Sequence, residues 1–173
     1  MHAELAHAKG ADKIFMIDPS EERLKLAKDF HVVALINSTK DDPVKKVMEL
    51  TGGEGVDVVI TACPANLAQE QAVQITARHG RISFFGGLSK DNPYIRIDSN
   101  LIHYREISVF GAFASHRRQY EEALELVAGK KVDMRKFITH RFKLEELVKA
   151  IETVKSGKCL KAVIEIKDEI ENK

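Results

Sequence analysis

The sequence predicts an α/β fold built on a doubly wound parallel sheet. Three observations support this prediction. Short apolar runs of strand type alternate with segments of helical periodicity, several of these runs end in glycine or aspartate, and 44% of the 173 residues are hydrophobic. A chain of this length and composition can bury one core, or one core with a small appendage.

The first elements of the chain follow this alternation. They are a helix ending at Gly10, a strand over residues 13–17, a helix from a Ser20 cap to about residue 29, a strand over 31–36, and a helix from Pro43 to Gly52-Gly53. Gly10 suits the end of a helix, Ser20 can cap a first turn, and Pro43 suits the first helical position. The apolar run over 31–36 is typical of a strand buried on both faces.

The middle elements continue the same rhythm. They are a strand over Val56–Thr61, a helix over 66–78, a strand over 80–86 and, after a connection containing Pro93, a strand over 106–110. The run VDVVIT is expected to be a buried strand, because continuous apolar runs are typical of parallel sheets covered on both faces.

The last part of the chain does not extend this rhythm. It predicts a helix over Arg117–Ala128, a strand over 138–142, a helix over 144–155 and a strand over 160–166. The inward residues expected for the first helix are Tyr120, Ala123, Leu124 and Val127, and those for the second are Leu144, Leu147, Val148, Ile151 and Val154.

The composition excludes several classes of protein. A net charge of +1 gives no indication of a nucleic-acid partner, and no apolar run approaches the ~20 residues that span a bilayer. The N-terminus does not resemble a secretory signal. Cys63 and Cys159 lie far apart, which fits a reducing compartment, so we expect a cytoplasmic protein. Without His-x-x-x-His or Cys-x-x-Cys spacing, these two residues are interpreted as small buried or half-buried thiols, and no metal site is predicted.

Residues 1–18 match the second half of a dinucleotide-binding βαβ unit. In such a unit a glycine-rich turn approaches a pyrophosphate, and an acidic residue about 20 residues later binds ribose hydroxyls. Asp18 follows an apolar run and fits the acidic position, although a helix cap or a turn is the alternative interpretation. The first strand and the Gly-x-Gly-x-x-Gly turn would come before Met1, so we expect the chain to begin inside its own nucleotide site.

Several residues that are suited to a ligand-binding site directly follow the predicted strand ends. Because the carboxyl ends of parallel strands joined by right-handed crossovers meet at one edge, these residues predict a ligand-binding edge. Glycines there allow a ligand to contact backbone amides, while ordinary tight turns are the alternative. The residues are Asp18, Cys63-Pro64, Gly86-Gly87-Leu88 and Gly111-Ala112-Phe113.

Six stretches together carry a resemblance to a known family. They are AELAHAKGADKIFMIDPSEERLKLAKDF, VKKVMELTGGEGVDVVITACP, ARHGRISFFGG, NLIHYREISVFGAFAS, YEEALELVAGKKVD and ITHRFKLEELVKAIETVKSGKCLKAVIEI. The chain resembles the C-terminal half of the zinc-dependent medium-chain alcohol dehydrogenases, in the sorbitol (L-iditol) and threonine dehydrogenase branch. The resemblance implies a Rossmann-like NAD-binding domain over residues 1–115, lacking its first strand, and a C-terminal part of the split catalytic domain over 116–173.

The resemblance also implies which residues contact NAD. Asp18 would bind the adenosine ribose and favour NAD over NADP, because a carboxylate repels a 2′-phosphate. The other implied contacts are Arg23 at the same ribose, Cys63 on the adenosine side, Gly86, Gly87 and Leu88 under the nicotinamide ribose, Ala112 and Phe113 at the carboxamide, and Lys161 at the pyrophosphate. For Arg23 and Lys161 the alternative is an ordinary solvent-facing side chain.

Three functions follow from these features. The first is the NAD-binding portion of an alcohol or polyol dehydrogenase. As an isolated chain it is expected to be inactive and to bind NAD weakly or not detectably, because the family's zinc ligands and glycine turn lie in a part absent from it. The second is a stand-alone nucleotide-binding or interaction module without catalysis. A methyltransferase using S-adenosylmethionine is the third, and residues 116–173 do not supply the antiparallel strand pattern expected of that fold.

The missing first strand would be the central one, since a doubly wound sheet has the order 3-2-1-4-5-6. Its absence would leave unpaired edges on residues 13–17 and 56–61, which invite pairing with another strand, and the strand over 160–166 is one candidate. Members of the family also pair subunits along the strand equivalent to residues 106–110. We therefore expect a homodimer or larger assembly.

Overall fold

The computed structural model describes residues 1–166, in which helices and parallel strands alternate. The chain forms two compact units, and each is described by itself. One unit contains Met1–Asn37 together with the residues from Arg117 onward, and the other contains Ser38–His116. This division differs from the domains expected over residues 1–115 and 116–173, which rest on the family relationship and stay a prediction.

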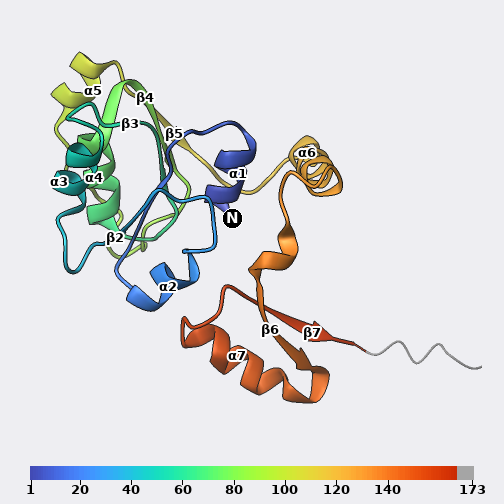
Figure 1. The fold of residues 1–173 in the computed structure, drawn as a ribbon. Coiled ribbons are helices and arrows are strands. Elements are labelled where there is room, and N and C mark those ends of the chain that lie inside the picture. The colour runs from blue at the N-terminus through green and yellow to red at the C-terminus, as the bar shows by residue number, and fades with distance from the viewer. Residues whose placement is uncertain (167–173) are drawn as a thin grey trace, which may run out of the picture. The chain divides into compact units, whose positions relative to one another are not determined.

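The Ser38–His116 unit has a three-stranded parallel sheet with the order β3-β4-β5 (Figure 1). Its strands are β3 (Val56–Thr61), β4 (Thr76–Phe84) and β5 (Ser108–Gly111), and its helices are α3 (Pro43–Leu50), α4 (Asn66–Ile75) and α5 (Ser99–Arg105). Asp42 caps α3, accepting hydrogen bonds from the amides of Val44 and Lys45. The prediction of a helix starting at Pro43 is confirmed.

Helices α4 and α5 cover one face of this sheet. Ala72 and Val73 of α4 are buried with Ile82 of β4 and Ile107, and they form the core of the unit. Ile82 is fully buried at the centre of the sheet. Partly buried residues from the strands and from α5 pack around this core, namely Val59, Phe84, Leu101 and Ile102.

The opposite face of the same sheet is exposed. Val58 is 47% exposed and Ile60 is 41% exposed, and both alternate along β3 with the partly buried Val59. Phe110 of β5 is paired with Ser83 of β4, which is paired with Ile60, so Phe110 lies on the same face. The expectation that Val56–Thr61 is buried on both faces is therefore wrong for the described chain, because helices cover the sheet on one face alone.

Two boundaries in this unit differ from the sequence prediction. Helix α4 ends at Ile75 and not near residue 78, because β4 begins directly at Thr76. The chain then bulges through His79, whose φ is 59°, before its regular pairing with β3 resumes. The sequence places residues 99–105 in the connection that contains Pro93, whereas the structure forms helix α5 there. The Asp98 carboxylate caps it by accepting a hydrogen bond from the amide of Asn100.

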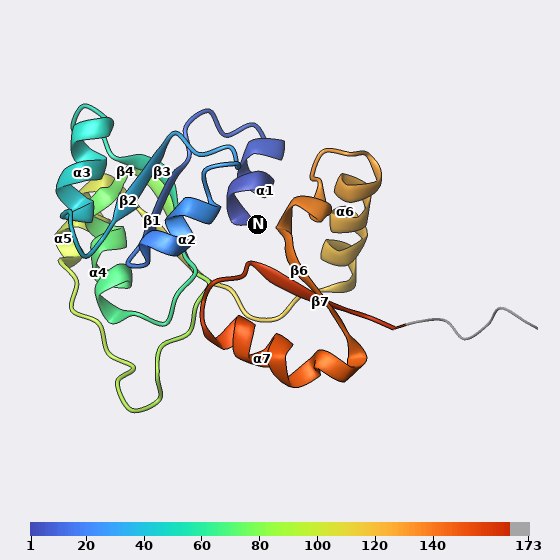
Figure 2. The ribbon, with the colours of Figure 1, turned by 60° about the horizontal axis from the view of Figure 1, so that its bottom comes forward.

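The N-terminal part of the other unit has a βαβ-like order. Its elements are α1 (His2–Ala8), β1 (Phe15–Asp18), α2 (Glu21–Leu26) and β2 (Ala34–Asn37), and β1 and β2 pair in parallel (Figure 2). Gly10 follows α1 with a φ of 92°, and the Ser20 hydroxyl caps α2 by accepting a hydrogen bond from the amide of Arg23. The sequence predictions for the end of α1 and the start of α2 are confirmed.

A buried carboxylate joins α1 to the segment before β2. Glu4 is 4% exposed, and its Oε1 atom accepts a hydrogen bond from the backbone amide of His31 at 3.0 Å. The same oxygen lies 2.8 Å from Nδ1 of His31, whose ring stacks on that of His7. These contacts fix α1, although it is a short helix with little propensity to form alone.

The C-terminal part of this unit has a second two-stranded parallel sheet. Its elements are α6 (Arg117–Ala128), the 3-10 turns η1 (Met134–Phe137) and η2 (Leu144–Glu146), β6 (Ile138–Lys143), α7 (Leu147–Lys155) and β7 (Lys161–Glu165). Strand β7 pairs with β6, and α7 packs beside both strands (Figure 1). Within the described residues, the C-terminal strand therefore has its own partner and does not fill a gap beside β1 or β3.

The apolar stripes of α6 and α7 are exposed, so the expectation that they face inward is wrong for the described chain. No residue of α6 is buried, and Leu124 is 69% exposed. In α7 the buried residue is Ala150, while all five residues of the predicted stripe are exposed. The helical periodicity identified both helices correctly, but no described element covers either stripe.

The strand pairings agree with a doubly wound sheet. Among the described residues, β1 pairs with β2 alone, and β3 pairs with β4 alone. In the order 3-2-1-4-5-6 these pairs would stand on either side of the first strand. The parallel α/β fold expected from the sequence is confirmed.

Candidate nucleotide-binding site

Three strand ends of the Ser38–His116 unit meet at one edge. The amide of Gly86, just after β4, donates a hydrogen bond to the carbonyl of Thr61 at the end of β3, with a distance of 2.7 Å. The amide of Ala112, after β5, donates to the carbonyl of Phe84 at 3.2 Å. The structure therefore brings together six of the nine site residues expected from the sequence, namely Cys63, Gly86, Gly87, Leu88, Ala112 and Phe113.

Gly86 is required for close packing. A Cβ atom at this position would lie 2.6–2.8 Å from the backbone of Cys63. Cβ atoms in proteins essentially never lie this close to another heavy atom, and backbone atoms cannot move aside as the end of a side chain can. The chain after β3 therefore lies directly against the turn after β4, with no room for a side chain between them.

Gly87 and Gly111 need a different explanation. A Cβ atom on either would meet no atom within 4 Å, and neither residue has a positive φ. Neither packing nor backbone conformation within the described residues requires glycine there. Glycine at these two positions leaves the backbone open to a flat or charged ligand at the carboxyl edge of the sheet, which is where nucleotides bind in open α/β folds.

The side chains at this edge are mainly apolar. Phe113 is fully exposed, the Cys63 thiol is exposed, and Leu88 is half-buried. The edge therefore offers backbone groups and apolar contacts, as small-molecule sites commonly do. It contains no acid or base placed for proton transfer among these residues.

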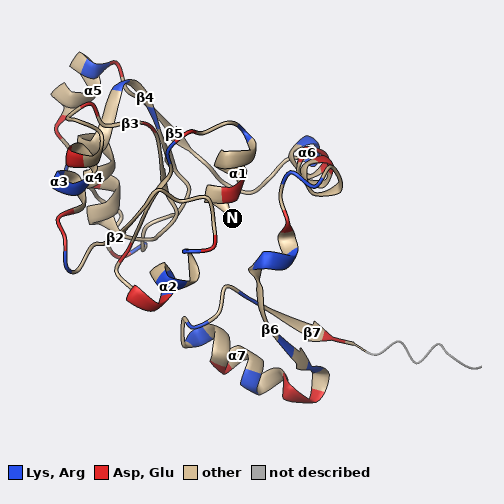
Figure 3. Cartoon of the chain, viewed as in Figure 1, with Lys and Arg blue, Asp and Glu red and all other residues tan. Residues whose placement is uncertain are grey.

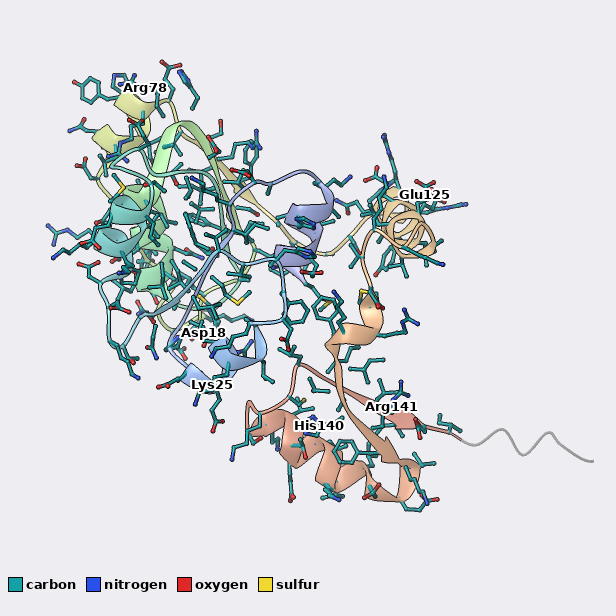
Figure 4. The ribbon with its side chains drawn as sticks, viewed as in Figure 1. Asp18, Lys25, Arg78, Glu125, His140 and Arg141 are labelled. Atoms are coloured by element: carbon teal, nitrogen blue, oxygen red, sulfur yellow. The ribbon has the colours of Figure 1, made fainter. Side chains whose placement is uncertain are left out.

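Asp18 and Arg23 lie together in the other unit. Asp18 ends β1, beside α2 (Figure 4), and its Oδ1 atom accepts a hydrogen bond from the amide of Ser20 at 2.8 Å. Its Oδ2 atom lies 3.3 Å from Nε of Arg23, which is more exposed. The interpretation of Asp18 as a turn residue is confirmed by this geometry. A carboxylate has about four acceptor positions, so Asp18 can bind a ribose hydroxyl as well.

Lys161 is the first residue of β7, and its side chain is exposed. Its carbonyl accepts a hydrogen bond from the hydroxyl of Thr139 on the neighbouring strand. This contact fixes its backbone and leaves its ammonium group in solvent, where it can bind an anion. The role of Lys161 at a pyrophosphate stays a prediction.

The sequence reasoning missed the polar residues of α4 that bind this edge. Gln69 is buried, and its amide Nε2 donates a hydrogen bond to the carbonyl of Gly86 at 3.1 Å. Gln69 belongs to the same helical stripe as Ala72 and Val73, which are core residues. Its position three and four residues before Ala72 and Val73 was a sequence signal that Gln69 is buried, but not of the atom that its amide binds.

The described residues do not fit a zinc site. They contain no group of three or more histidine, cysteine or acidic side chains that could hold a metal ion, whereas zinc in proteins needs three or four such ligands. Cys63 and Cys159 are both free thiols; Cys159 is half-buried as expected, whereas Cys63 is exposed, so the expectation of burial is wrong for Cys63. Charged side chains of both signs lie along α6 and α7 (Figure 3): in α6 two arginines precede three glutamates, and in α7 lysine and glutamate alternate. Among residues 1–166, every helix is too short or too polar to span a bilayer.

Comparisons with known proteins identify the family of this chain. The sequence profile of a family described as zinc-binding dehydrogenase matches residues 1–129. L-threonine 3-dehydrogenase of Bacillus subtilis is 31% identical over 166 residues, which cover 95% of this chain and 47% of that protein. The chain thus spans about half the length of the curated relatives it matches.

Solved structures show the same fold. Benzyl alcohol dehydrogenase from Acinetobacter calcoaceticus matches with a TM-score of 0.84 at 24% identity, over 95% of this chain and 46% of that one. A zinc-binding dehydrogenase structure from Sinorhizobium meliloti, described as putative and bound to NADP, matches with a TM-score of 0.77 at 23% identity, over 86% and 44%. The chain belongs to the zinc-binding dehydrogenase family, of which it represents the C-terminal, cofactor-binding part.

Proposed function

We propose that this chain is the NAD-binding portion of an alcohol or polyol dehydrogenase. The observation that carries the proposal is the open backbone at Gly87 and Gly111, beside the joined ends of three parallel strands. Glycine there serves no internal packing, so its place at the ligand edge of the sheet is explained by a ligand that approaches the backbone.

The described residues would hold the two ends of the dinucleotide differently. On the nicotinamide side, Gly86, Gly87 and Leu88 would lie under the ribose, and the backbone at Ala112 and Phe113 would bind the carboxamide. On the adenosine side the proposed contacts are Cys63, Asp18 and Arg23, with Lys161 at the pyrophosphate. When bound, NAD accepts hydride from an alcohol.

Asp18 is proposed to select NAD over NADP. Its carboxylate already contacts Arg23 at 3.3 Å, so the nearest cation is partly neutralised before any ligand binds. A 2′-phosphate would bring two negative charges towards a carboxylate, and like charges at such distances repel. The NADP-bound relative makes this selectivity worth measuring directly.

Hydride transfer by the whole protein is also part of the proposal. The relative from Bacillus subtilis is named for L-threonine, a secondary alcohol, and we expect a secondary alcohol or polyol as substrate. The chain by itself is proposed to be inactive, because its described residues contain no group of three or more ligands that could hold the zinc on which the family's chemistry depends. A cytoplasmic location and a homodimer or larger assembly complete the proposal.

Nuclear magnetic resonance titration of the ¹⁵N-labelled chain with NAD, NADP and AMP tests the binding. We expect weak binding of NAD, with shifts at Gly87 and Ala112, and weaker binding of NADP. We expect weak affinity because none of the proposed contacts is a pyrophosphate-binding glycine turn. Absence of shifts with every nucleotide would overturn the proposal.

A dehydrogenase assay of the same sample, with NAD and L-threonine or sorbitol, is the first of two steps that separate a dehydrogenase portion from a nucleotide-binding module without catalysis. Binding without turnover fits both an NAD-binding portion and a module without catalysis. Adding a separately produced zinc-binding N-terminal part of a relative then distinguishes them, because turnover is restored only if the chain is a dehydrogenase portion. Turnover by the chain alone would contradict the proposed inactivity.

A further inference from the structure

A long segment without helix or strand connects β4 to α5. It covers residues 85–98 and contains the proposed contacts Gly86, Gly87 and Leu88. Irregular segments of this length inside a compact unit are uncommon, and ordered ones usually have a function. In this unit the segment follows a defined path, because side chains of α4 bind its backbone at several points.

Three residues of α4 make these contacts. The Asn66 amide Nδ2 donates to the carbonyls of Asn92 and Tyr94 at 3.0 and 2.7 Å. Glu70 Oε1 accepts a hydrogen bond from the amide of Arg96 at 2.8 Å. With Gln69, these side chains stand at positions i, i+3 and i+4, so they share one face of the helix. We call Asn66, Gln69 and Glu70 the polar face of α4.

Gln69 differs from the other two because it is buried. It is 4% exposed, and its amide donates to the carbonyl of Gly86. Gly86 is held from two further directions, by the bond from its amide to Thr61 and by its contact with the backbone of Cys63. The peptide between Gly86 and Gly87 is therefore fixed in orientation.

This orientation has a consequence for Gly87. The chain has no cis peptide in its described residues, and in a planar trans peptide the carbonyl and the following N–H point in opposite directions. Because the Gly86 carbonyl points at Gln69 on α4, the Gly87 N–H points away from α4. Gly87 itself borders open space.

We propose that Gln69 is a positioning residue that turns the Gly87 N–H towards the nicotinamide half of the dinucleotide. The inference rests on the proposed NAD-binding function. Gln69 does not contact the ligand; it fixes the peptide that does. Asn66 and Glu70 hold the rest of the segment, so that the turn cannot rotate together with the chain that follows it.

The test uses the whole chain with substitutions in α4. Gln69→Met keeps the length of the side chain and removes the donor. Gln69→Glu is the second variant, in case the first fails to fold, because it keeps size and polarity while its carboxylate cannot donate. Gln74→Ala is the control, since Gln74 is an exposed glutamine on the same helix, and it is its backbone carbonyl that accepts the hydrogen bond from Arg105.

Titrations with NAD and with AMP then distinguish positioning from folding. We expect the Gln69 variants to bind NAD about two- to tenfold more weakly, the range for one lost hydrogen bond, with a smaller shift of the Gly87 amide. AMP, which lacks the nicotinamide half, should bind all variants equally, and Gln74→Ala should bind both ligands as the wild type does.

Two results would overturn this inference and leave the proposed function standing. They are an unchanged affinity for NAD in both Gln69 variants, and an equal loss of affinity for NAD and AMP, which would indicate general damage to the fold. A wild-type chain that binds neither ligand would instead overturn the proposed function, and the inference with it.

Discussion

Replacing Gly86 with alanine tests the packing at the ligand edge. The new Cβ atom would lie 2.6–2.8 Å from the backbone of Cys63, and the amide of Gly86 is already bonded to Thr61 at 2.7 Å. One of the two backbone segments must therefore move. Overpacking of this kind destabilises proteins by about 1–3 kcal/mol. For a chain of this size, that corresponds to a decrease of roughly 2–12 °C in Tm.

Gly87→Ala is the matched control for this experiment. Its Cβ atom would meet no atom within 4 Å, and its φ is not positive. Alanine restricts the unfolded chain more than glycine does, so this substitution should stabilise the protein by about 0.4–1 kcal/mol or leave its stability unchanged. Urea unfolding followed by circular dichroism measures both variants. An unfolding midpoint for Gly86→Ala equal to that of the wild type would refute the reasoning, because the clash would then be absorbed without cost.

Three further predictions concern other parts of the chain. Asp18→Ala should reduce the affinity for NAD and the preference for NAD over NADP in calorimetry or NMR titration, and an unchanged preference would contradict the role of Asp18. Burial raises the pKa of the Glu4 carboxyl, but the hydrogen bonds from the backbone and ring of His31, with the charges of His31 and Lys136, outweigh it and hold the pKa below its ordinary value. The stability that ionised Glu4 contributes is therefore present at neutral pH and lost as the pH falls through the folded-state pKa. In urea unfolding, the free energy of unfolding of Glu4→Gln should differ from that of the wild type at neutral pH, and the two values should converge in acid. Finally, the purified chain should retain no stoichiometric zinc after dialysis against a weak chelator, as elemental analysis can measure.

Local signals in the sequence predicted most elements of the fold. Caps such as Ser20 and Asp42 fix helix starts by satisfying free amides, and the apolar run Val56–Thr61 matches β3 residue for residue. Helix α5 was missed because its cap at Asp98 follows a long irregular segment, and its apolar residues form a short stripe. The junction of α4 and β4 was missed because no turn residue separates Ile75 from Thr76.

Burial could not be predicted equally well. The periodicity of α6 and α7 identifies an apolar side on each helix, but it does not specify which element covers that side, and none of the described elements does. At the site, the meeting of Cys63, Gly86 and Ala112 follows from parallel topology alone. The role of Gln69 does not, because a glutamine in a helix is identical in sequence whether its amide binds water or a buried carbonyl.

The division of the chain into two units has a consequence for synthesis on the ribosome. Ser38–His116 is continuous, so this unit can fold as soon as it has emerged, whereas residues 1–37 share a unit with residues from Arg117 onward, which are made later. Phe30 stacks on Phe137, and Glu4 lies near the charge of Lys136. During translation the unit that contains residues 1–37 therefore cannot be completed until its residues from Arg117 onward have been made.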